Sequence, residues 1–170
     1  MRNGPIESIE LRCPVVIEKR GLFERSAGAG KFRGGFGVET KARGLVDGMW
    51  NLKQSRRRFN PPWGLNGGKP GQPSQILIKL PNETEWKILD ASRYNLPRNA
   101  TVILRNSGGG GWGSPLEREP ELVLNDFVDG LISIDQATNE YGVFIDPKTH
   151  SIDFEATKKI RSENREKEKN

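Results

Sequence analysis

The run of four glycines from Gly108 to Gly111 is the feature that most constrains the fold of this chain. Glycine loses more backbone freedom on folding than any other residue, so an ordered run of glycines needs a strong structural reason. The β-branched and apolar residues 101–104 precede the run and predict a buried strand. Ser114 and Pro115 follow it as a helix N-cap and a first helical residue. This geometry suits a ligand cradle and, equally, a crowded structural corner.

The spacing of Gly108, Gly110 and Gly113 matches the dinucleotide-binding fingerprint G-x-G-x-x-G. That fingerprint needs a βαβ unit around it, whereas the next apolar segment here is helical or turn-like. Pro115 and Pro120 also interrupt the helix that would have to point at a pyrophosphate. A crowded corner, or close approach to a ligand or partner chain, is the better interpretation of the glycines.

A second glycine-dense segment contains the pair Gly30 and Lys31, which suggests a phosphate loop. That motif requires glycine where Arg25 stands and serine or threonine where Phe32 stands, so it fails at both ends. A backbone nest that holds an anion, with help from Lys31 and Arg33, stays open.

Residues 41–69 carry seven Lys or Arg residues and a single acid, Asp47. Arginines such as Arg58 lie beside Phe59 and Trp63, and these residue types bind phosphate or stack on bases. The more ordinary interpretation is a solvated or partner-facing surface, with Trp63 as the anchor of an ordered loop. Because the formal charge of +5 is mild and its surplus is diffuse, we expect no nucleic acid as a partner.

Composition restricts the chemistry that this chain can carry out alone. Only 34% of its residues are apolar, while 20 are glycine and 11 proline, which predicts short strands, many turns and a modest core. A single cysteine, Cys13, fits a reducing, cytoplasmic setting. With His150 as the only imidazole, in a predicted hairpin turn, we expect neither a metal site nor a catalytic triad. No apolar run reaches membrane-spanning length, so we expect no membrane contact.

Hydrophobic patterning predicts an α+β fold, mainly β in the N-terminal two-thirds, with long Gly/Pro-rich loops and then short helices and a small hairpin. We expect three units: a β-rich domain over 1–115, a helical and hairpin segment over 116–157, and a charged tail over 158–170. The predicted strands are 6–17, 38–45, 48–53, 76–80, 85–89, 101–104, 141–145 and 151–154, and the predicted helices are 116–128, 133–140 and a charged helix from 155.

Read together, these segments resemble the C-terminal part of the hydantoinase B/oxoprolinase family. The matching positions run in order almost from end to end of the chain, and their order and spacing are specific. They are residues 4–7, 28–37, 58, 61–71, 108–115, 118–121, 126, 130, 133, 137, 141–143, 153, 156–157 and 161.

The resemblance implies ATP-dependent hydrolysis of a cyclic amide, such as hydantoin, N-methylhydantoin or 5-oxoproline, or a related carboxylation. It implies a hydantoinase A-type subunit that uses ATP, and a divalent metal in the full complex. Family members are much longer, and the metal-ligand positions of their larger N-terminal part have no counterpart here. We therefore expect a C-terminal fragment or split-gene product that binds no cofactor and is inactive alone. Its partners would be the missing N-terminal part of the same subunit, the A-type subunit and the substrate.

Site residues follow from the same resemblance, and the catalytic residues themselves stay unknown. Glycine-rich loops can offer backbone N–H groups to a phosphorylated carbonyl oxygen, so substitution of Gly109 or Gly110 is expected to lower activity without unfolding the chain. The alternative is a non-catalytic interaction or assembly module left from a truncated or split gene. The candidates for the phosphate or substrate loop are Gly108, Gly109, Gly110, Gly111, Lys31, Arg33 and Arg58, and those for an interface are Trp63 and Trp112.

Overall fold

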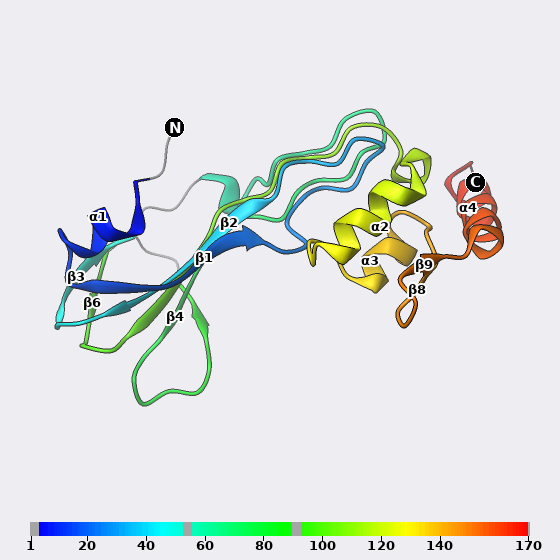
Figure 1. Ribbon diagram of the computed structural model, residues 1–170. Coiled ribbons are helices and arrows are strands. Elements are labelled where there is room, and N and C mark those ends of the chain that lie inside the picture. The colour runs from blue at the N-terminus through cyan, green and yellow to red at the C-terminus, as the bar shows by residue number, and fades with distance from the viewer. Residues whose placement is uncertain (1–3, 53–55, 90–92, 170) are drawn as a thin grey trace.

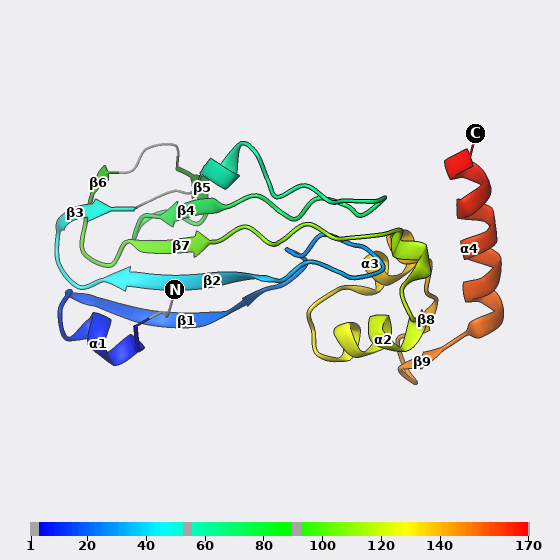
Figure 2. The same ribbon diagram turned by 90° about the horizontal axis from the view of Figure 1, so that it is seen from above.

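The computed structural model describes residues 4–52, 56–89 and 93–169. The molecule is elongated, with a β-sheet at one end and a group of short helices at the other (Figure 1). Several extended segments run side by side between the two ends, and they come from distant parts of the sequence (Figure 2). Each end has its own hydrophobic core.

The sheet end is an antiparallel five-stranded sheet in the order β1-β2-β7-β4-β5, beside a separate two-stranded ladder of β3 and β6. Its core is apolar and includes Val102, which is fully buried at the centre of β7. The strands are β1 (Val15–Phe23), β2 (Gly37–Gly44), β3 (Gly48–Asn51), β4 (Gln75–Lys79), β5 (Lys87–Ile88), β6 (Arg93–Leu96) and β7 (Thr101–Arg105).

The helical end packs two short helices and a small hairpin around the buried ring of Tyr141. The last helix of the chain lies beyond this group, and Arg161 joins it to the group by hydrogen bonds (Figure 2). The elements are η2 (Pro115–Glu117), α2 (Pro120–Val128), α3 (Ile134–Asn139), β8 (Ile145–Asp146), β9 (Ser151–Ile152) and α4 (Phe154–Lys169), while α1 (Ile6–Glu10) and η1 (Arg56–Arg58) lie at the sheet end.

The predicted α+β class is confirmed, as are the strands at β2 and β7 and the hairpin of β4 and β5. The strand predicted over 48–53 is confirmed as β3 up to Asn51, and residue 53 lies outside the described residues. The small hairpin of β8 and β9 forms, but of the strand predicted over 141–145 only Ile145 belongs to β8. The predicted strand over 6–17 is wrong in its first half. Residues 6–10 form α1, and the strand begins only at Val15, after Pro14, and continues through Phe23. Strand β6 was not predicted. The three-unit division stays a prediction.

The helix predicted over 116–128 is broken in two. Arg118 is extended, with φ −68° and ψ 136°, and α2 begins at Pro120. Proline has no N–H to donate and disfavours helical geometry at the residue before it, so the helix restarts at Pro120. The predicted cap at Ser114 is confirmed, because its hydroxyl accepts a hydrogen bond from Leu116 N.

The helix predicted over 133–140 is confirmed as α3, and Ser133 caps its N-terminus. The hydroxyl of Ser133 accepts a hydrogen bond from Gln136 N at 3.2 Å. The side chain of Gln136 donates to Glu140 at 3.3 Å, where a capping box would return it to the Ser133 backbone.

Candidate functional site

The extended segments between the two ends form what we call the glycine bundle, defined as residues 26–37, 57–74 and 106–115. The three segments of the bundle lie side by side in both views, and residues 106–115 run along the other two (Figures 1 and 2). Backbone hydrogen bonds join residues 106–115 to each of the other two segments. The four glycines, Lys31 and Arg33 are thus brought together in the bundle, whereas Arg58 lies at its margin, as the last residue of η1.

Backbone amides of the four-glycine run are used inside the bundle. Three of the four donate to carbonyl oxygens of the neighbouring segments, at ordinary hydrogen-bond lengths. Gly110 is the exception, since no backbone acceptor for its N–H lies among the described residues. The three bonds are Gly108 N to Gln72 O (3.2 Å), Gly109 N to Gly35 O (2.8 Å) and Gly111 N to Lys69 O (2.9 Å).

The four glycines also explain how closely the segments approach. Gly108 faces residues 26–27, Gly109 faces residues 34–35 of the same segment, and Gly110 faces residues 63–64. Gly111 then returns to residues 28–29, next to those that Gly108 faces, three residues later. That period of three is the repeat of a polyproline II helix, and crowding of this kind admits only glycine. An added Cβ would lie 1.8 Å from Ser26 O at Gly108, 1.9 Å from Trp63 O at Gly110 and 2.1 Å from Ala29 O at Gly111, but 3.1 Å from Gly35 N at Gly109.

These contacts change the interpretation of the glycines from ligand cradle to packing. A cradle needs free N–H groups, and three of the four are already donated within the chain. The expectation that Gly110 can be substituted without unfolding is not supported, because its added Cβ would overlap a backbone oxygen. The same expectation for Gly109 stays a prediction, since its nearest contact is at 3.1 Å.

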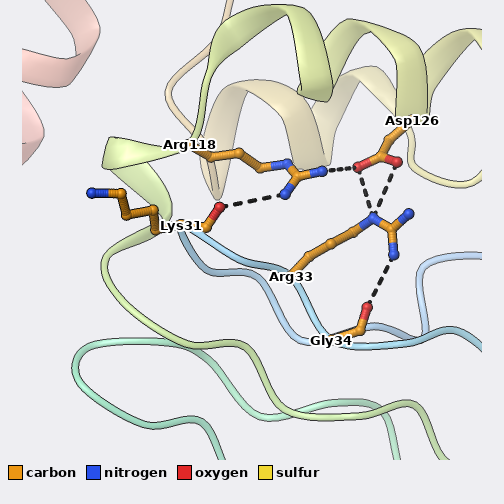
Figure 3. A network of polar contacts seen from close by, with 5 residues as sticks. All are labelled: Lys31, Arg33, Gly34, Arg118 and Asp126. Atoms are coloured by element: carbon orange, nitrogen blue, oxygen red, sulfur yellow. Dashed lines mark hydrogen bonds and ion pairs between the residues drawn. The ribbon is translucent and has the colours of Figure 1, made fainter.

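Arg33 joins the bundle to the helical end through Asp126 of α2 (Figure 3). Its Nε donates to both carboxylate oxygens of Asp126, at 3.1 and 2.9 Å, and its Nη1 donates to Gly34 O at 3.1 Å. The guanidinium also lies over the ring of Phe36, 4.6 Å from its centroid. Arg33 is therefore held by three residues within the chain, which leaves it poorly placed for the predicted phosphate contact.

Arg118 approaches the same carboxylate from the other side (Figure 3). Its Nη2 donates to Asp126 Oδ2 at 2.9 Å, and its Nη1 donates to Lys31 O at 3.4 Å. The side chains of Arg118 and Asp126 are only 8% and 7% exposed. Two guanidinium groups thus share one carboxylate, and Arg118 Nε is buried with no partner among the described residues. Removing one partner of a buried ion pair leaves the other charge unpaired, which strongly lowers the stability of the fold. The Arg118–Asp126 pair therefore fixes α2 relative to the segment before it.

Two further contacts tie α4 and the Tyr141 turn to this network. Arg161 of α4 donates to Tyr141 O at 3.1 Å and to Arg118 O at 2.7 Å. The ring of Tyr141 lies 5.9 Å from the guanidinium of Arg118. Burial raises the pKa of the Tyr141 hydroxyl to about 12, so it stays protonated under ordinary conditions.

The other candidates lie on the surface. Lys31 Nζ is 3.3 Å from Glu117, in an ion pair that is half exposed. Trp63 stacks against Arg57, whose guanidinium is 5.7 Å from the ring centroid, and the two line an open pocket of about 590 Å³ with Asn60 and Pro61. Trp112 is exposed as well. Exposure of both tryptophans agrees with an interface, and their role there stays a prediction.

The described residues do not fit a divalent metal. No group of three His, Cys, Asp or Glu side chains comes together within the described ranges. Cys13 is exposed, and His150 lies in the β8–β9 turn at φ 52°, with its ring edge-on to Phe127 at 5.4 Å. Among those residues, no helix has the length and apolar character needed to cross a membrane.

Sequence reasoning missed the roles of Asp126 and Arg118. Both belong to the pattern that carries the family resemblance, but nothing local marks them as partners of Arg33, which lies 93 residues before Asp126. The one signal in the sequence was a carboxylate on a helix face that is otherwise apolar.

Comparisons with known proteins agree with this fold. Caprolactamase subunit β of Pseudomonas jessenii is 34% identical over 150 residues, which are 86% of this chain and 26% of that protein. The crystal structure of the ATP-dependent caprolactamase from the same organism superposes with a TM-score of 0.77 at 32% identity, covering 94% of this chain and 28% of that one. An acetone carboxylase structure shares the fold, with a TM-score of 0.78 at 24% identity over 97% of this chain and 26% of its own.

The chain thus spans about a quarter of the length of these relatives. The match to the family described as hydantoinase B/oxoprolinase extends over residues 1–115, which include the sheet and all three segments of the glycine bundle. This chain belongs to the hydantoinase B/oxoprolinase family.

Proposed function

We propose that this chain is the C-terminal part of a hydantoinase B-type subunit that takes part in ATP-dependent hydrolysis of a cyclic amide. The observation that carries the proposal is the family match over residues 1–115, together with the fold shared with ATP-dependent caprolactamase. Caprolactam is itself a cyclic amide, and the family description names two further cyclic-amide hydrolases. We propose hydantoin, an N-methylated hydantoin or 5-oxoproline as the substrate.

The chemistry requires activation of an unstrained amide carbonyl. ATP, bound by a hydantoinase A-type partner subunit, supplies the phosphoryl group for that activation. The part of this chain is positional: the Arg33–Asp126–Arg118 network fixes the helical end to the glycine bundle, and the bundle fixes that end relative to the sheet. Of the predicted cradle, we retain only the Gly110 amide as a candidate donor to substrate.

A second candidate function is a non-catalytic assembly module, and two observations favour it. The glycine amides are mostly consumed inside the bundle, and large apolar side chains are exposed on its surface. In this alternative the chain docks on the remainder of the subunit or on the A-type subunit and contacts no substrate.

A chimera separates the two. The matching quarter of P. jessenii caprolactamase subunit β is replaced by this chain, and ATP-dependent lactam opening is measured after assembly with the other caprolactamase subunit. We expect the chimera to assemble and retain activity. If the Gly110 amide contacts substrate, Gly109→Ala, which crowds the backbone next to that amide, should lower kcat without changing assembly. Full activity in that variant favours the assembly module. A chimera that folds and assembles but opens no lactam contradicts both roles.

The chain alone provides the matched control. The purified 170-residue polypeptide, mixed with ATP and hydantoin or 5-oxoproline, is expected to release neither ADP nor ring-opened product. Turnover by this polypeptide alone would contradict the proposal that it supplies only part of the site.

A further inference from the structure

The open pocket beside Trp63 joins a large aromatic ring to a side-chain amide. Its volume is about 590 Å³, and it is lined by Arg57, Asn60, Pro61 and Trp63. Small-molecule sites in proteins have volumes of roughly 300–1,000 Å³, and they combine aromatic or apolar walls with a few polar groups. The pocket therefore has the size and the residue types of a small-molecule site.

The ring of Trp63 is exposed on a backbone that is held in place. Trp63 is 66% exposed, and the guanidinium of Arg57 lies over its ring at 5.7 Å from the centroid. Two prolines precede it, and each fixes its own φ. The second of them, Pro62, accepts a hydrogen bond from Gly71 N at 2.9 Å. A ring on such a backbone loses little conformational freedom when a ligand stacks on it.

Asn60 presents the two polar groups of its amide on one edge of the pocket. The residue is exposed, and its side chain makes no hydrogen bond within the part of the chain that the structure describes. A primary carboxamide carries an acceptor oxygen and a donor N–H side by side. Such an edge forms two parallel hydrogen bonds with a ligand that has its own donor and acceptor side by side, as asparagine does with adenine.

A cyclic amide has the edge that Asn60 requires. Open-chain secondary amides are almost always trans, which places the N–H and the C=O on opposite sides. A small ring holds the amide cis, so that both groups lie on one edge. The ring of hydantoin is also flat, so it can stack on the indole of Trp63 while its amide edge pairs with Asn60.

The pocket adjoins the four-glycine run. An added Cβ at Gly110 would lie 1.9 Å from Trp63 O, so the backbone that carries the indole is in contact with Gly110. The Gly110 N–H has no backbone acceptor among the described residues, and it is the amide retained above as a candidate donor to substrate. A ring bound at Trp63 is therefore held next to that amide.

We propose that this pocket binds the ring of a flat cyclic amide, with Trp63 stacked on the ring and Asn60 paired with its N–H and C=O. That the ring belongs to a substrate rests on the proposed function. The chemistry of the ligand follows from the exposed indole and from the amide edge of Asn60.

Titration of the isotope-labelled chain with hydantoin, followed by NMR, tests the proposal, because each tryptophan gives its own indole N–H signal. We expect a saturable shift of the Trp63 signal and no shift of the signal of Trp112, which is exposed elsewhere on the bundle. N,N′-dimethylhydantoin keeps the flat ring but has no N–H to donate, so it should bind about tenfold more weakly. The trans amide N-methylacetamide should cause no saturable shift.

Variants separate the two contacts, with the backbone amide of Gly64 as the reporter of binding. Trp63→Leu should weaken hydantoin binding about tenfold, whereas Trp63→Phe retains a ring and Trp112→Leu is the matched control, so neither should do so. Asn60→Ala should weaken the binding of hydantoin about tenfold and leave that of N,N′-dimethylhydantoin unchanged, because only the first ligand uses the amide edge.

Three results overturn the proposal: equal shifts at Trp63 and Trp112, tighter binding of adenosine than of hydantoin, or equal losses for the two hydantoins in Asn60→Ala. Binding of hydantoin with the expected pattern, by a chain whose chimera opens no lactam, supports the pocket and contradicts the proposed function. An active chimera in which Trp63→Leu leaves the KM for the lactam unchanged contradicts the pocket alone.

Discussion

Strand β7 and the four-glycine run are consecutive parts of one extended chain, yet they are stabilised in opposite ways. In β7, Val102 is fully buried, and its side chain packs in the core beneath the sheet. A few residues later, Gly108 and Gly111 are also buried, but they lie against backbone oxygens of residues 26–29 and donate their N–H groups to backbone oxygens of Gln72 and Lys69. The strand relies on side-chain packing, whereas the bundle relies on the absence of side chains.

This difference sets what each region tolerates. A sheet core can lose or rearrange a methyl group at a modest cost, because neighbouring side chains adjust. The bundle has no side chains in its interior that could move aside, so one added methyl group must displace a backbone. We therefore expect a substitution that adds a methyl group to destabilise the bundle more than a substitution that removes one destabilises the sheet.

The largest expected effect is that of Gly110→Ala, which inserts a Cβ at 1.9 Å from Trp63 O. We expect it to lower the free energy of unfolding by about 3 kcal/mol or more, the upper end of the overpacking range. Chemical denaturation followed by circular dichroism measures the loss. Gly35→Ala is the matched control, because its Cβ would meet nothing within 4 Å. Equal losses for the two variants would show that the glycines are not packing residues.

Asp126→Asn is expected to rank second. It leaves Arg33 and the buried Arg118 facing a neutral amide, and breaking a buried ion pair costs about 3 kcal/mol. Asp129→Asn changes an exposed carboxylate one residue beyond α2 and should cost less than about 0.5 kcal/mol. Thermal unfolding of both variants gives the comparison. If Asp126→Asn is as stable as Asp129→Asn, the network does not hold the helical end in place.

A smaller effect is expected for Ile103→Val in β7. This residue is buried on the face of β7 opposite Val102 and loses one methylene, which costs about 1 kcal/mol. We expect the loss of a methylene from the sheet to lower the free energy of unfolding less than the gain of a methyl group in the bundle. Denaturation under the conditions used for Gly110→Ala measures both. A loss in Ile103→Val larger than that in Gly110→Ala reverses the predicted ranking.

The sheet should also respond to acid, through Glu39 of β2. Burial acts to raise the pKa of Glu39, but the hydrogen bond and charge of Arg105, with those of Lys19, outweigh it and lower the pKa below the ordinary 4.5. The contribution of Glu39 to stability is therefore complete above pH 4.5 and is lost as pH falls through its folded pKa. Glu39→Gln should unfold less steeply with acid than the unmodified chain does. Identical acid profiles would contradict this assignment.

Much of the sheet was predictable because its strands carry the side-chain pattern that the fold uses. The β-branched and apolar runs at residues 76–80 and 101–104 predicted β4 and β7 close to their observed bounds. The glycine bundle could not be predicted in the same way, because glycine gives no hydrophobic periodicity to read. The sequence marked the run at Gly108 as crowded, but not which segments crowd it.

The ion network was equally hidden in the sequence. Arg33 was predicted as a phosphate ligand, since an arginine beside glycines fits that chemistry. Its partner Asp126 lies in a helix far along the chain, and the two meet only because the bundle returns residues 26–37 to the helical end. Local reasoning identified the charged group but not its partner within the chain, and a phosphate contact of Arg33 stays a prediction.

The central claim is that the amides of the four-glycine run are occupied inside the bundle. Native-state hydrogen exchange, resolved residue by residue, tests it directly. We predict that the amides of Gly108, Gly109 and Gly111 are as strongly protected as those of β7, that Gly110 exchanges faster, and that added phosphate changes none of them. Fast exchange at all four glycines, with protection appearing only when phosphate is added, would contradict the claim and restore the ligand cradle.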